Sequence, residues 1–121
     1  MPEPSTDRQV IKLLFSNPTS RNLLAIWARV AGSRFPIQVV CDLLGSTEDI
    51  LDPKLQSMAG IGLVHVSTDV KGGQNIEFLA NVNAELVTVI EEFLESRKGE
   101  FETVETKVRS LLYITLLNHP A

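Results

Sequence analysis

Residues 45–64 read GSTEDILDPKLQSMAGIGLV. Its apolar residues recur at the spacing of one helix face, which predicts a helix with one buried side. The apolar residues that the segment carries are Ile50, Leu51, Leu55 and Met58. Glu48 and Asp49 suit its first turn, because carboxylates stabilise the positive end of a helix.

Pro53 complicates this helix. In a helix interior, proline removes one backbone hydrogen bond and crowds the preceding turn, at a cost of about 3 kcal/mol. Asp52 followed by Pro53 instead suits an N-cap and a first helical position. We therefore predict that the helix begins at Asp52 and that TEDIL (47–51) forms a separate turn.

Three further helices are predicted before this stretch. Asn17 followed by Pro18 is typical of an N-cap with proline at the first helical position, where its missing N–H costs nothing. Pro36 opens another helix, which Gly45 ends. The predicted ranges are 7–15, 18–32 and 36–44. Trp27 falls on the apolar face of the second helix, and we expect it in the core.

The pattern changes after residue 62. LVHVS (63–67) alternates like a strand, TDVKGGQN (68–75) reads as a turn, and IEFLA (76–80) returns as a second strand. Residues 32–36 are predicted to be only a connection. Asn83 caps a long helix over 84–98, and another amphipathic helix follows over 102–118.

Short helices followed by a two-stranded hairpin are the layout of a winged helix-turn-helix. The predicted fold class is α+β, mainly α, with a two-stranded wing and C-terminal dimerisation helices. A single hairpin is unstable in water, so it must pack on the helices. We divide the chain into a flexible tail (1–6), a winged-helix domain (7–82) and a C-terminal helical extension (83–121).

Three stretches resemble the ArsR-type winged-helix regulators. SNPTSRNLLAIW (16–27) resembles that family's entry to its second helix, and KLQSMAGIGLV (54–64) resembles the exit of its recognition helix. FLANVNAELVTVIEEFLE (78–95) resembles the second wing strand running into the dimerisation helix. The resemblance covers roughly residues 8–95.

The resemblance implies a homodimeric transcription regulator that places two recognition helices in successive major grooves of double-stranded DNA. The residues in position for DNA are Arg34, Gln38, Lys54, Gln56, Ser57, Lys71, Gln74 and Asn75. For the dimer, the apolar stripe of 103–117 is longer than so small a domain would cover internally. Its members are Val104, Val108, Leu111, Leu112 and Leu116.

The charges oppose strong DNA binding. The chain carries a net charge of −4, and residues 42–77 alone hold six acidic and two basic residues. Carboxylates near the reading helix repel phosphates, so we expect DNA binding to be weak or atypical. The alternative is a winged-helix protein-interaction module, an adaptor or antagonist, whose acidic face at residues 45–59 binds a protein partner.

Other classes of function find little support in the sequence. No Gly-rich phosphate loop or catalytic set stands at a recognisable spacing, so we expect no enzymatic activity and no cofactor. His65 and His119 lie far apart in the sequence, and Cys41 is alone, so no metal site is predicted. We interpret Cys41 as a small buried hydrophobe of a cytoplasmic protein. No apolar run in the sequence is as long as the about 18 residues that a membrane-spanning helix needs.

Overall fold

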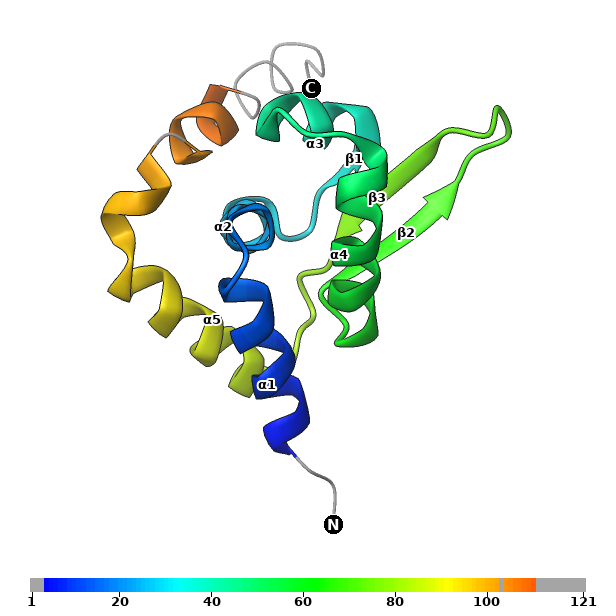
Figure 1. The fold of residues 1–121 in the computed structure, drawn as a ribbon. Helices are drawn as coiled ribbons and strands as arrows, with labels where there is room; N and C mark the ends of the chain where they lie inside the picture. The colour runs from blue at the N-terminus through cyan, green and yellow to red at the C-terminus, as the bar shows by residue number, and fades with distance from the viewer. Residues whose placement is uncertain (1–3, 103, 111–121) are drawn as a thin grey trace.

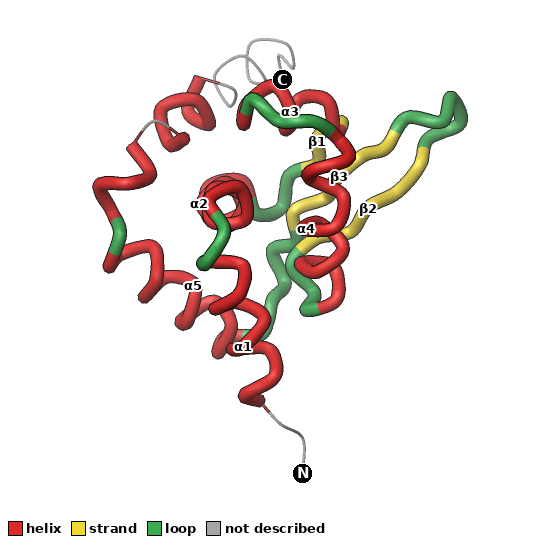
Figure 2. The backbone as a smooth tube through the Cα atoms, in the orientation of Figure 1, coloured by secondary structure: helices red, strands yellow, loops and turns green. Residues whose placement is uncertain are grey.

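A computed structural model describes residues 4–102 and 104–110. This part of the chain is α+β and mainly helical, with a small three-stranded antiparallel sheet (Figures 1 and 2). Residues 104–110 are again helical. In chain order, the elements before them are α1 (Pro4–Phe15), α2 (Pro18–Val30), β1 (Arg34–Pro36), α3 (Ile37–Leu44), α4 (Glu48–Gly60), β2 (Val64–Thr68), β3 (Gln74–Phe78), α5 (Ala84–Ser96) and the 3-10 helix η1 (Lys98–Phe101).

Helix α2 lies at the centre of the molecule (Figure 1). The five consecutive residues 23–27 are all buried, which means that the central turn of α2 is covered on every side, since one helical turn takes 3.6 residues. Helices α1 and α5 and residues 104–110 surround it on one side, and α3, α4 and the sheet lie on the other (Figure 1). The predicted cap is confirmed, because the Asn17 side chain accepts a hydrogen bond from the backbone N–H of Ser20.

Helix α1 begins at Pro4, earlier than the predicted start at Asp7. Residues 4–6, assigned from the sequence to a flexible tail, are therefore helical. Proline is compatible with this position because the first turn of a helix has no partner for its N–H groups. Packing against α2 and α5 holds the helix in place.

The sheet has the strand order β1-β3-β2. Both strands of the predicted hairpin are present, with β3 beginning two residues earlier than expected. Strand β1 was not predicted, because it has three residues, one of them Pro36, and a single buried side chain, Phe35. Its pairing partner is a distant segment of the chain, with Phe35 opposite Ile76, so local sequence carries no signal for it.

The prediction that a helix begins at Asp52 is wrong. Helix α4 runs without interruption from Glu48 to Gly60, with Pro53 inside it. The reason lies in the burial of Leu51, Leu55 and Met58, all 0% exposed. Each such side chain contributes about 1.5–3 kcal/mol, which together exceeds the cost of one proline. Pro53 itself is exposed, so the disrupted turn faces solvent.

The C-terminal helices belong to the same core as the rest of the chain. The boundary predicted between residues 82 and 83 does not separate two cores, since Ile90 and Phe101 join one hydrophobic cluster with α2. Val104 and Val108 are 7% and 1% exposed within the single chain, so they are not available as the dimerisation contacts predicted from the sequence. The other three predicted dimerisation residues, Leu111, Leu112 and Leu116, lie outside the described residues.

Replacing Pro53 by alanine tests the continuous helix. We expect Pro53→Ala to raise the free energy of unfolding by up to about 3 kcal/mol, because it restores a hydrogen bond to the Asp49 carbonyl and removes the crowding. Urea denaturation measures the change. Gln56→Ala, at an exposed position of the same helix, is the matched control and should change stability by no more than about 0.5 kcal/mol. A helix that began at Asp52 would instead gain nothing from the loss of this proline.

Candidate interaction face on α4 and the hairpin

The outward side of α4 is set by the residues that the helix buries. With Leu51, Leu55 and Met58 in the core, the opposite side is turned to solvent. Acidic residues occupy its first half, and neutral polar residues its second. The outward side consists of Glu48, Asp49, Asp52, Pro53, Gln56, Ser57 and Gly60, of which only Asp52 is half-buried.

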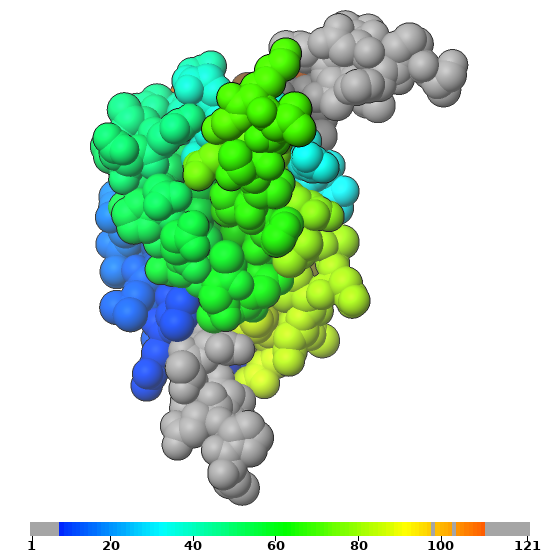
Figure 3. Space-filling view, turned by 90° about the vertical axis from the view of Figure 1, so that its right-hand side faces the viewer, coloured from blue at the N-terminus to red at the C-terminus, as the bar shows by residue number. Residues whose placement is uncertain are grey.

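A cleft of about 510 Å³ separates the first half of α4 from the hairpin. Its helix wall carries the carboxylates of Glu48, Asp49 and Asp52 together with Pro53, and its other wall is formed by Gly72, Gly73 and Gln74. No basic side chain lines it. Figure 3 views the molecule from the side on which α4 and the hairpin lie next to each other. The cleft is therefore a small anionic depression on that face.

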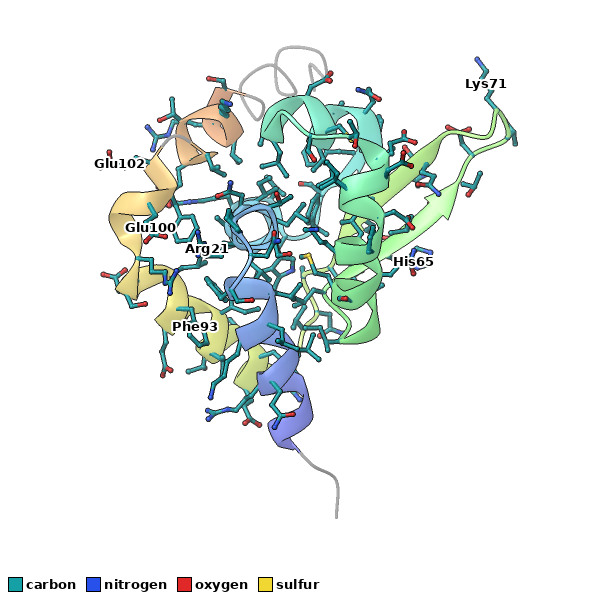
Figure 4. The ribbon with its side chains drawn as sticks, viewed as in Figure 1. Arg21, His65, Lys71, Phe93, Glu100 and Glu102 are labelled. Atoms are coloured by element: carbon teal, nitrogen blue, oxygen red, sulfur yellow. The ribbon has the colours of Figure 1, made fainter. Side chains whose placement is uncertain are left out.

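The hairpin tip is held by Asp69. One of its carboxylate oxygens, Oδ1, accepts hydrogen bonds from the backbone N–H groups of Lys71 and Gly73, both at 2.9 Å. Gly72 adopts a φ of 84°, which glycine permits without strain. These bonds occupy the Asp69 carboxylate within the turn. Val70 and Lys71 are exposed to solvent at the tip, where Figure 4 shows Lys71.

Several residues predicted to contact DNA are engaged within the chain. Lys54 donates from Nζ to the Ile50 carbonyl at 3.4 Å, and Ser57 donates from Oγ to the Pro53 carbonyl at 3.2 Å. Gln38 on α3 donates from Nε2 to Asp42 Oδ1 at 2.9 Å. These contacts are local and exposed, so they orient the side chains but hold them only weakly.

The remaining predicted residues are dispersed over this half of the molecule. Arg34, on β1, stands opposite Glu77 in the sheet register. Gln56 and Lys71 are exposed on α4 and at the hairpin tip. Gln74 lines the acidic cleft, and Asn75 is half-buried within β3. The structure thus does not gather the predicted DNA contacts into one cationic surface.

Two apolar residues on this half of the molecule were not singled out from the sequence as surface residues. Ile50 is 48% exposed on α4, and Val70 is fully exposed at the hairpin tip. Single exposed apolar side chains are common on protein surfaces, so these two do not form an interaction patch by themselves. The only sequence signal for Val70 is an apolar residue inside a predicted turn.

Metal and thiol chemistry find no support in the described part of the chain. Residues 4–102 and 104–110 contain no group of three or more His, Cys, Asp or Glu side chains that could hold a metal ion. The buried position predicted for Cys41 is confirmed, at 1% exposure. Burial raises the pKa of its thiol above the ordinary value, and the negative charges of Glu48 and Asp42 raise it further. His65 is exposed on β2, and His119 lies outside the described residues.

Comparisons of this chain with protein-family models, with characterised proteins and with solved structures gave no match. Within the part of the chain that the structure describes, no helix has both the length and the apolar character needed to cross a bilayer.

The raised pKa of Cys41 gives a pH-dependent prediction. The folded state retains the thiol proton at a pH where the unfolded chain, whose thiol has the ordinary pKa of 9.0, has lost it. The contribution of this thiol to the free energy of unfolding is therefore fully present below about pH 9, and it is lost progressively as the pH rises above that value. Urea denaturation between pH 7 and about pH 10, compared with the same series on Cys41→Ala, isolates this contribution. An identical decline in the alanine variant would show that other groups cause it.

Proposed function

We propose that the chain is a winged helix whose hairpin β2–β3 forms the wing. The proposal is supported by the order of α2, α3 and α4 followed by a hairpin, with β1 as the third strand of a small sheet. In such a fold, α4 occupies the place of the reading helix and the hairpin flanks it. The function of the chain then depends on what the α4–hairpin face can bind, because fold alone does not determine it.

We propose that this face binds a cationic segment of a protein partner, which makes the chain a non-catalytic interaction module. The observation that carries the proposal is the acidic cleft between α4 and the hairpin, with three carboxylates and no basic residue in its lining. Lysine or arginine side chains of the partner would enter the cleft. Ile50 and Val70 would supply apolar contacts outside it.

The electrostatics of the cleft explain the choice of a cationic partner. Two positions of the cleft, Glu48 and Asp49, stabilise the first turn of α4, but Asp52 lies one turn further along and gains little from the helix end. Like charges held on one short wall repel each other, and a cation relieves that repulsion. Since the carboxylates are largely exposed, their pairing with a partner costs little desolvation.

The second candidate is the DNA-binding regulator, acting as a cytoplasmic homodimer, that the sequence resemblance implies. The observation in its favour is the layout itself, a helix–turn–helix followed by a hairpin with the exposed base Lys71 at its tip. The charges count against it. From residue 34 to residue 77 the chain holds three bases and six acids, a net charge of −3, where phosphate contacts require a net excess of bases.

Fluorescence anisotropy separates the two functions. The probes are a labelled arginine-rich peptide without apolar residues and a labelled mixed-sequence DNA duplex, each titrated at low and at physiological salt. We expect the unmodified chain to bind the peptide and not the duplex. In Asp49→Asn/Asp52→Asn, peptide affinity should fall about fivefold, since two exposed ion pairs at roughly 0.5 kcal/mol each are lost.

The matched control neutralises Glu100 and Glu102, which lie on the opposite side of the molecule (Figure 4). Glu100→Gln/Glu102→Gln changes the net charge by the same amount and should leave peptide affinity within about twofold of the unmodified chain. An equal loss in both double variants would mean that the peptide responds only to net charge. Salt-sensitive binding of the duplex by the unmodified chain would assign the face to DNA instead.

A further inference from the structure

A second depression lies on the other side of the molecule from the hairpin. It is a groove of about 890 Å³ bordered by α2, α5 and the helical residues 104–110. Figure 1 shows α5 and residues 104–110 on the side of the central helix α2 that faces away from α4 and the hairpin. The groove therefore shares no lining residue with the acidic cleft.

Small side chains and a fixed helix keep this groove open. Ala25 and Ala28, one turn apart on α2, line the bottom of the groove, and their methyl side chains fill little of it. Within the helical residues 104–110, Val108 is buried in the common core, and Glu105 makes an ion pair with Arg29 of α2, with 3.0 Å between Nη2 and Oε1. The wall that they form cannot collapse onto the alanines without losing those contacts.

The chemistry of the groove combines an apolar floor with an anionic rim. Leu94, half-buried on α5, extends the floor formed by the two alanines. On the rim, Glu91, Glu92 and Glu95 are exposed, and the ion pairs among the side chains that the structure describes include none of the three. Glu91 and Glu95 stand four residues apart on α5, so they lie on one side of that helix.

We propose that this groove docks an amphipathic cationic helix of a partner protein. A trough between helices accepts a third helix by ridges-into-grooves packing, and alanines on its floor allow a close approach. The apolar ridge of the incoming helix would lie on Ala25, Ala28 and Leu94. Lysine or arginine residues beside that ridge would pair with the α5 carboxylates.

This inference does not depend on the proposed function of the α4–hairpin face. The cleft is lined by α4 and the hairpin, and the groove by α2, α5 and Glu105. Figure 1 shows α4 and the hairpin on the opposite side of α2 from α5, so two partners can occupy the two depressions without overlap. A chain with both surfaces occupied would hold two partners together, which is the physical role of an adaptor.

The test uses the full chain and a labelled 14-residue helical peptide in which leucines form one stripe and lysines cover the rest. We expect binding that weakens at least tenfold in Ala28→Trp, because the indole fills the groove without changing any charge. Glu91→Gln/Glu95→Gln should weaken binding too, by about fivefold. A peptide with the same lysines and with serine in place of leucine should bind far more weakly, since it lacks the ridge.

The control variant is Asp42→Asn/Glu77→Gln, which removes the same charge at two exposed positions outside both depressions and should leave this peptide's affinity within about twofold of the unmodified chain. Circular dichroism and thermal unfolding check that Ala28→Trp folds, and the glutamine pair provides the test if it does not. Equal binding by the unmodified chain and both groove variants would overturn the proposal. Self-association of the chain that Ala28→Trp abolishes would overturn it as well, by assigning the groove to a second copy.

Discussion

The burial of the central turn of α2, residues 23–27, is the constraint on which the rest of the structure depends. A helix with apolar residues on every side must be surrounded, and the chain does so with helices on one side and with α3, α4 and the sheet on the other. The Trp27 indole N–H donates to the Leu79 carbonyl at 2.9 Å, and the Phe78 N–H donates to the Ser33 carbonyl at 2.8 Å. These bonds join α2 and the segment after it to the end of β3.

Both candidate surfaces follow from that arrangement. On one side, α4 buries Leu51, Leu55 and Met58 toward the centre, and its carboxylates are consequently turned outward beside the hairpin. On the other, the small side chains Ala25 and Ala28 leave space between α2 and the helices that cover it. The surfaces are thus consequences of how the core is filled rather than separate additions to the fold.

The two surfaces share a charge sign but differ in lining. The α4–hairpin cleft is polar and short, which suits individual cationic side chains. The α2–α5 groove has an apolar floor and is larger, which suits a helix with an apolar ridge. Ion pairs between exposed groups contribute little each, so charge sets the class of partner and the apolar floor supplies affinity and selectivity.

The sequence by itself determined the local features. The Asn17–Pro18 cap, the end of α3 at Gly45, the hairpin and the Asn83 cap of α5 all follow from residues that act on their immediate neighbours. The acidic composition of the α4 face was equally readable.

Only the tertiary structure decided the rest, because contacts between distant segments carry no local signal. Strand β1 exists because β3 offers it an edge, and α4 passes through Pro53 because the core takes up three of its side chains. Val104 and Val108 are directed into the chain's own core, where their periodicity alone indicated a free apolar stripe. Amphipathic spacing fixes which face of a helix is apolar, and tertiary packing fixes what covers that face.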